Sequence, residues 1–379
     1  RLPFISTLFD CTSIGLELLL DRLRQGGNVI LVEHLPEPSE VMSAEAHSLQ
    51  SFELVIPLGT SGGAEGSPQI VVRQSQLMQL TDANGVSSTH TRRRVYTPTG
   101  EWTYAKIYLG IGSADRILRS VVYPLAEAST LTGNVLMWHF LRYADPDFHL
   151  RFRLFGDPTH IRKSVLPLLE GTLDEELNAG SIHNLVYATY RPEIERYGGD
   201  DGITLSEQIF FHDSRGVARL LASDAFDRTE RARYQAAFAS VAALGRDFGF
   251  TREELAAELR ARQGARQDRR IQWSREYREW RAFLSDLRVN SQAGWAGEIS
   301  YHLAQRSTAI APLVSAFNER FTGTTGRNRL TEIWASLAHM TVNRLLRAPD
   351  RLAESMIYDF VARFLLSETA LNRHSSTAI

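Results

Sequence analysis

The sequence has little cysteine and no long hydrophobic run. Cys11 is the single cysteine among 379 residues, which excludes an internal disulfide and a cysteine-based zinc site. No apolar run approaches the roughly 20 residues that cross a bilayer, and the residues after Arg1 have no signal-peptide pattern. We therefore expect a cytoplasmic protein without membrane insertion, and we expect this chain to be a fragment that lacks its upstream part.

The chain also has almost no net charge and almost no lysine. Its 42 basic and 44 acidic residues leave a formal net charge of −2, which argues against a protein that binds nucleic acid over its whole surface. Lys106 and Lys163 are the only lysines, so the other 40 basic residues are arginines. A coding bias alone can produce this ratio, so only arginines that a structural pattern places carry weight.

The spacing of apolar residues predicts an α+β fold, with a small mixed sheet followed by a largely helical C-terminal half. Beyond Leu205 the sequence is rich in alanine and contains only Pro312 and Pro349, which favours helices almost throughout. The expected strands are 102–111, 135–142, 148–155 and 182–190, and the expected helices between them are 113–123 and 161–169.

Composition further predicts two units joined by a polar linker. Residues 1–86 are expected to form a small α+β unit, with strands at 28–33 and 52–58. Residues 87–100 are the predicted linker, because they are polar, arginine-rich and followed by a strong strand pattern. Residues 101–379 then form the second unit.

Two glycine motifs resemble functional signatures but favour plainer interpretations. Residues 59–63 match the G-x-S-x-G elbow of serine hydrolases, but more glycine and Pro68 follow where a helix is needed, so we interpret them as a loop. The Gly-Ile-Gly triplet at 110–112 stands where a dinucleotide fingerprint would begin. Asp115 occupies its third glycine position and would repel a pyrophosphate, so a tight strand-to-helix turn is expected.

Two further segments are interpreted in the same way. His212, Asp213 and Ser214 are consecutive, and consecutive side chains on a helix point roughly 100° apart, so they cannot act together as a triad. Asp213 or Ser214 is expected to bind nearby backbone instead. Residues 260–281 mix arginines with aromatics, but the apolar residues from Trp273 to Leu284 are spaced by four, three and four, which indicates a buried helical stripe rather than a nucleic-acid surface.

The most informative pattern is the alternation around Arg151. On an extended strand, His149, Arg151 and Arg153 share one face, and the apolar residues between them share the other. Two guanidinium groups about 7 Å apart suit a ligand with two carboxylates, because each can form paired hydrogen bonds to one. We predict that these three side chains bind an anionic substrate, and a plain polar sheet face is the alternative.

Two other places carry chemically useful residues. Glu193 and Arg196 stand three apart after Pro192, so that the carboxylate can orient the guanidinium on a helical turn. His339 belongs to a helical stripe that also contains Ser336 and Asn343, between apolar flanks. Such a stripe often lines a cavity, and histidine is the natural proton carrier there, although a structural histidine is the alternative.

Taken together, these segments resemble the C-terminal domain of class I lanthipeptide dehydratases, which also occurs as a free-standing protein in thiopeptide biosynthesis. Five stretches match in order over roughly residues 101–379. They are WTYAKIY at 102–108, HLRFR at 149–153, YRPEIERYGG at 190–199, FHDS at 211–214 and HMTVNR at 339–344. The first unit is similar, more weakly, to the last part of the preceding glutamylation domain.

The resemblance implies a specific activity. In such enzymes the upstream domain transfers glutamate from glutamyl-tRNA to serine or threonine of a precursor peptide, and the C-terminal domain eliminates it to leave dehydroalanine or dehydrobutyrine. Arg151, Arg153, Glu193, Arg196 and His339 fall on the positions that the family uses for elimination. The resemblance therefore implies a lyase that acts on a glutamylated peptide, without a metal or organic cofactor, in concert with a glutamylation domain or subunit outside this chain.

Three points stay open at this stage. Two functions are alternatives to the lyase. One is the cycloaddition by which a sister branch of the family forms the pyridine ring of thiopeptides, and the other is that of a non-catalytic subunit that only binds precursor peptide. The sequence does not decide whether His339 removes or supplies a proton, and a homodimer is neither required nor excluded.

Overall fold

We analysed a computed structural model of the chain. It describes residues 80–81, 87–88, 93–263, 277–278, 280–283, 294–348 and 350–376. The chain divides between Ser75 and Gln76, and all described residues belong to the second unit. The elements predicted before residue 80, including the loop at 59–63, lie outside the described residues, so the predicted boundaries at 86 and 100 stay predictions.

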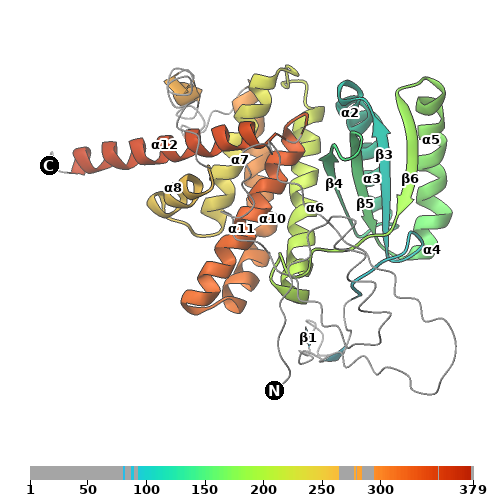
Figure 1. The fold of residues 1–379 in the computed structure, drawn as a ribbon, viewed down its shortest axis with the longest axis horizontal. Helices are drawn as coiled ribbons and strands as arrows, with labels where there is room; N and C mark the ends of the chain where they lie inside the picture. Colours follow the sequence, from blue (N-terminus) through green and yellow to red (C-terminus); the bar gives the residue numbers. More distant parts are fainter. Residues whose placement is uncertain are drawn as a thin grey trace, which may run out of the picture. The chain divides into compact units, whose positions relative to one another are not determined.

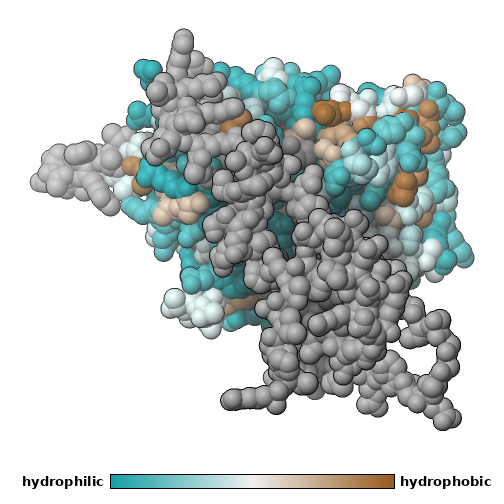
Figure 2. All heavy atoms as spheres, in the orientation of Figure 1, coloured by the Kyte–Doolittle hydropathy of each residue, from teal (hydrophilic) through white to brown (hydrophobic). Residues whose placement is uncertain are grey.

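Figure 2 shows mostly hydrophilic residues on one face of the described part, with scattered hydrophobic ones. None of the described helices has both the length and the apolar character needed to cross a membrane.

A four-stranded sheet forms the first layer of this unit, with the strands in the order β4-β5-β3-β6 (Figure 1). Its strands are β3 (Trp102–Leu109), β4 (Met137–Tyr143), β5 (His149–Phe155) and β6 (Ile182–Ala188), and a separate short ladder joins β1 (Leu80–Thr81) to β2 (Ser87–Ser88). The α+β class and the four strand positions are confirmed. All described ladders are antiparallel, rather than the mixed pairing that we expected.

Helices follow and flank the sheet. Those near the strands are α2 (Ile111–Ile117), the π-helical turn η1 (Leu118–Val122), α3 (Tyr123–Leu131), α4 (Pro158–His160), the π-helical turn η2 (Ile161–Val165) and α5 (Leu166–Asn178). The C-terminal helices are α6 (Gly199–Ala222), α7 (Glu230–Asp247), α8 (Arg252–Ala261), α10 (Gly294–Arg320), α11 (Gly323–Leu345) and α12 (Arg351–Ser376). The Gly-Ile-Gly triplet at 110–112 forms the direct turn from β3 into α2, as predicted.

The alternation of β5 divides the sheet into an apolar and a polar face. Leu150, Phe152 and Leu154 are at most 1% exposed and pack in the main core, whereas Arg151 and Arg153 are half-buried on the opposite face. Burying three such side chains contributes on the order of 5 kcal/mol, which fixes the strand's register because a one-residue slip would exchange the two faces.

The outer edge of β4 is covered by helices instead of another strand. Asn343 of α11 accepts a hydrogen bond from the backbone N–H of Arg142 at 2.9 Å and donates one to its carbonyl at 2.9 Å. Arg344 donates to the carbonyl of Phe140, and Ser214 of α6 accepts from the N–H of Phe140. The expectation that Asp213 or Ser214 binds backbone is thus confirmed for Ser214, and α6 and α11 are fixed against β4 (Figure 1).

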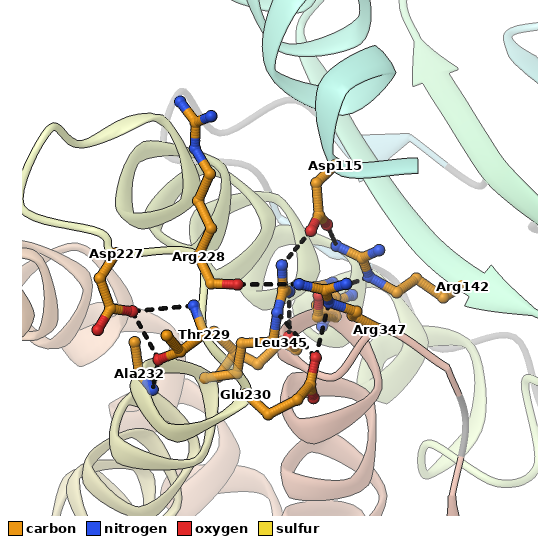
Figure 3. Close-up of polar contacts among 11 residues, drawn as sticks. Asp115, Arg142, Asp227, Arg228, Thr229, Glu230, Ala232, Leu345 and Arg347 are labelled. Atoms are coloured by element: carbon orange, nitrogen blue, oxygen red, sulfur yellow. Dashed lines mark hydrogen bonds and ion pairs between the residues drawn. The ribbon is translucent and has the colours of Figure 1, made fainter. Parts of the chain in front are cut away.

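An ion-pair network joins the sheet layer to the C-terminal helices on the core side (Figure 3). Asp115 of α2 contacts the guanidinium groups of Arg142 in β4 and Arg233 in α7, and Arg233 also donates to the carbonyl of Leu345 at 2.9 Å. Both arginine side chains are fully buried. Burial alone would raise the pKa of Asp115, but the two adjacent cations hold it below the usual value of 3.8.

Replacing Asn343 tests the covering of the β4 edge. Asn343→Ala leaves both backbone groups of Arg142 buried without partners, so we expect the free energy of unfolding to fall by about 2–4 kcal/mol. Urea denaturation measures this change. The exposed Asn178→Ala at the end of α5 is the matched control, and equal unfolding midpoints for the two variants would contradict the assignment.

Replacing Asp115 tests the ion-pair network through its pH dependence. Because its folded-state pKa is depressed, Asp115 stabilises the fold fully above its ordinary pKa, and this stabilisation is lost as the pH falls through the depressed value. Asp115→Asn should therefore cost about 3 kcal/mol at pH 7, since two buried cations lose their carboxylate. Thermal unfolding should show that the stability difference from wild type shrinks below about pH 4. The exposed Asp174→Asn is the control, and it should change neither the stability at pH 7 nor its dependence on pH.

Candidate functional site

The polar face of the sheet carries a cluster of cations. Arg153 pairs across the strands with Tyr104 of β3, and Arg151 pairs with Lys106. Directly opposite residues in a sheet point to the same side, so these groups share one face with His149. We call the side chains of Lys106, His149, Arg151 and Arg153 the cationic face.

Arg153 is held by aromatic rings rather than by a carboxylate. Its guanidinium carbon lies 4.6 Å from the ring centroids of both Tyr104 and Tyr190. Burial raises the pKa of Tyr104, so this partner remains a neutral phenol. No carboxylate of the described residues comes within ion-pair distance of Arg153, and its buried Nε has no hydrogen-bond partner among them. Such a cation is placed to bind an external anion.

Arg151 is supported in a similar way. Its guanidinium carbon lies 3.3 Å from the ring centroid of Tyr143, and its Nε donates to Nε2 of His149 at 3.4 Å. His149 itself is buried, and its Nδ1 lies 2.8 Å from the carbonyl of Asp147. Burial and, less strongly, the Arg151 cation lower the pKa of His149, so the neutral ring can donate to Asp147 and accept from Arg151. His149 therefore orients Arg151 and does not present a free edge to the face.

The turn after Pro192 aims Arg196 at α11. The Arg196 guanidinium donates to Glu193 at 2.9 Å, as the spacing predicted, and its Nε donates to Oγ of Ser336 at 3.1 Å. Gly198 follows with a φ of +90°, and a Cβ there would lie 2.6 Å from the ring of Phe321. Only glycine fits this close approach, which brings the turn against the helical layer.

His339 is oriented by a residue that the sequence analysis missed. Its Nδ1 lies 2.9 Å from both carboxylate oxygens of Glu354 in α12, and Tyr358 donates to Glu354 at 2.5 Å. Burial alone would raise the pKa of the Glu354 carboxyl. The hydrogen bonds with His339 and the positive charge of the His339 ring have the larger combined effect, so this pKa lies below its usual value. An ionised Glu354 holds the proton on Nδ1 and leaves Nε2 of His339 for chemistry.

Helix α11 carries His339 and contacts Arg196, two of the predicted site residues. Ser336 contacts Arg196, His339 one turn later contacts Glu354, and Asn343 another turn later holds β4. The segment from Tyr190 to Arg196 links the cationic face to α11, because the Tyr190 ring contacts Arg153 and Arg196 donates to Ser336. Asn343, which we expected to line a cavity with His339, binds the sheet edge instead.

Sequence reasoning missed Glu354, Tyr104 and Tyr190 because their roles are partnerships across distant elements. Glu354 and Tyr358 stand four apart on a helix, which could have indicated their mutual contact, but nothing local points to His339. Among the described residues, no group of three His, Cys, Asp or Glu side chains is arranged to hold a metal ion.

Comparisons with known proteins agree with this architecture. The chain is 37% identical to the nisin biosynthesis protein NisB of Lactococcus lactis subsp. lactis over 135 residues, which is 34% of this chain and 12% of NisB. It is 24% identical to the subtilin biosynthesis protein SpaB of Bacillus subtilis over 295 residues, which is 75% of this chain and 27% of SpaB. The chain thus spans about a quarter or less of these relatives.

Two solved structures share the fold. The tRNA-dependent lantibiotic dehydratase MibB from Microbispora sp. 107891 matches with a TM-score of 0.61 and 24% identity, over 73% of this chain and 29% of MibB. The pyridine synthase TbtD from thiomuracin biosynthesis matches with a TM-score of 0.53 and 16% identity, over 70% of this chain and 98% of TbtD. The sequence profile of the family described as lantibiotic biosynthesis dehydratase, C-terminal, matches residues 102–365. Because this match covers well over half of the residues and includes every element of the site, the chain belongs to that family.

Proposed function

We propose that the chain eliminates glutamate from glutamylated serine or threonine of a ribosomally made precursor peptide, leaving dehydroalanine or dehydrobutyrine. The observation that carries this proposal is Arg153, a cation that lies 4.6 Å from the ring centroids of two tyrosines and has no carboxylate partner among the described residues. The proposal assigns to the same site Arg196, which Glu193 holds, and His339, which pairs with Glu354. A site with two anchored guanidinium groups and a proton-transfer group suits a substrate that loses a carboxylate.

The chemistry sets the charges that must be stabilised. A base removes the Cα proton, the electron pair forms the Cα–Cβ double bond, and the Cβ–O bond breaks with release of the glutamate carboxylate. Negative charge develops on the adjacent amide oxygen and on the departing carboxylate. Fixed cations in a partly buried site stabilise both, because they need no reorganisation during the step.

Each guanidinium has its own support in this scheme. Arg153 and Arg196 hold the free carboxylate of the glutamyl group and the ester carboxyl that departs as the second carboxylate, and Arg151 adds to the same field. Glu193 fixes Arg196 in one orientation through the 2.9 Å hydrogen bond, and His149 does the same for Arg151. His339 moves a proton through Nε2, and Glu354 stabilises the imidazolium and selects its tautomer.

Replacing the site residues should stop the reaction at the glutamylated intermediate. His339→Ala removes the proton carrier and Arg153→Ala removes the anion anchor, so each should lower the rate of glutamate release by about 10²-fold or more. Mass spectrometry of a glutamylated precursor peptide incubated with each variant measures this loss. Arg162→Ala, at an exposed arginine of η2, is the matched control with an unchanged rate.

The same assay distinguishes the three classes of function. Dehydrated residues and free glutamate mark the lyase, a pyridine ring formed from an already dehydrated peptide marks the cycloaddition enzyme, and binding without product marks a scaffold. Wild-type elimination by folded His339→Ala and Arg153→Ala proteins would refute the site.

Glu354 provides a sharper test of the histidine's role. Glu354→Gln keeps the size and a hydrogen bond but loses the charge that fixes the Nδ1 proton, so kcat for elimination should fall by at least about 10²-fold while KM changes little. Tyr358→Phe removes only a donor to Glu354 and should cost roughly tenfold or less. Steady-state kinetics of glutamate release gives both values, and a Glu354→Gln enzyme with wild-type kcat contradicts this role.

A further inference from the structure

Lys106 lies at the centre of the cationic face. It stands opposite Arg151 in the β3–β5 ladder and opposite Val186 in the β3–β6 ladder. Its Nζ lies 5.8 Å from the ring centroid of Tyr104, the same ring that stacks on Arg153. The lysine thus lies on the inner strand β3, on the proposed substrate face and beside the two arginines of β5.

The surroundings of Lys106 are unusual for a lysine. Arg151 and Arg153 face it from β5, Tyr104 and Tyr108 flank it on β3, and no ion pair or hydrogen bond of its Nζ occurs among the described residues. Asp145 attracts it weakly from the β4–β5 connection, and His149 is held neutral. Partial burial and the two neighbouring arginines lower the pKa of Lys106.

The composition of the chain makes this lysine more informative. With 40 arginines and only two lysines, a position that needs nothing but positive charge is filled by arginine almost everywhere. Arginine cannot lose its proton at an accessible pH, whereas a lysine amine can when its surroundings disfavour the charged form. A lysine beside two arginines in the site therefore points to a titratable amine.

We propose that Lys106 is the general base that removes the Cα proton of the glutamylated residue, and that His339 gives a proton to the departing glutamate. This inference rests on the proposed function. In the step, neutral Lys106 takes the Cα proton, the Cα–Cβ double bond forms, and the Cβ–O bond breaks. The imidazolium of His339 protonates the released carboxylate or remains paired with it, so charge and protons balance.

The geometry favours this division of roles. His339 stands one turn after Ser336 on α11, and Ser336 accepts a hydrogen bond from Arg196, so the histidine belongs to the helix face that meets the guanidinium assigned to the leaving glutamate. Lys106 lies on the sheet opposite Arg151, which is not assigned to a glutamyl carboxylate and can stabilise the charge that the peptide's amide oxygen gains. His149 is not an alternative base, because both of its ring nitrogens are engaged.

The two-lysine composition allows a direct measurement of the amine. Reductive methylation with ¹³C-formaldehyde labels Lys106, Lys163 and the N-terminal amine, and NMR follows each methyl signal with pH. We expect the Lys106 signal to titrate at a lower pH than that of the exposed Lys163, with assignments from Lys106→Arg and Lys163→Arg. Coincident titration of the two lysines overturns the proposal, whatever the chain's activity.

Kinetics then test the catalytic role. Lys106→Arg keeps the positive charge but cannot act as a base, so kcat should fall by about 10²-fold or more with little change in KM, and the rise of kcat with pH should disappear. Lys163→Arg is the matched control with wild-type kcat. Wild-type kcat in Lys106→Arg overturns the proposal, whereas absence of glutamate release by the wild-type chain overturns the proposed function itself.

A chemical rescue covers the case in which the arginine variant is distorted. Lys106→Cys is made together with Cys11→Ser, so that the introduced thiol is the only one in the chain. Alkylation with 2-bromoethylamine restores an amine of nearly lysine length. Recovery of elimination after alkylation supports the proposal, and a folded, alkylated protein without recovery contradicts it.

Discussion

Among the described residues no strand pairs with the outer edge of β4, and its buried backbone groups must still be paired. Asn343, Arg344 and Ser214 provide these hydrogen bonds from α11 and α6. These hydrogen bonds fix the position of α11. The Asn343 amide both accepts from and donates to the backbone of Arg142, so α11 cannot slide along its axis or rotate without breaking one of the two bonds. His339 stands one turn from Asn343, so the sheet edge decides where the imidazole lies relative to the cationic face.

The need to pair buried polar groups also explains two of the five sequence stretches by which the chain resembles the family, residues 211–214 and 339–344. Most polar residues of 211–214 and 339–344 are structural: Asp213 accepts from Arg344 at 2.9 Å and from Arg306 at 3.1 Å, and it also binds Thr341. These groups are buried, so removing one would leave the others unpaired in a medium of low dielectric constant. A motif can thus preserve the position of a catalytic group without containing many catalytic residues.

Two groups of buried or half-buried arginines in the described part differ in what holds them. Arg142, Arg233, Arg306 and Arg344 are buried with carboxylate partners and join elements to one another. Arg151 and Arg153 rest on tyrosine rings and have no carboxylate partner among the described residues. Aromatic support holds a guanidinium in place without neutralising it, which leaves its charge for a ligand. This distinction, rather than the number of arginines, marks the cationic face.

The sequence by itself determined the strands and their facing, because alternation over β5 depends only on the two-residue repeat of an extended chain. It also determined the Glu193–Arg196 contact and the Gly110 turn, which are set by neighbours within a few residues. Only the tertiary structure decided that Glu354 binds His339, that Tyr104 and Tyr190 enclose Arg153, and that Asn343 holds β4 rather than lining the site. These contacts join residues far apart in the chain, and their geometry follows from the packing of whole elements, which no local pattern of residues specifies.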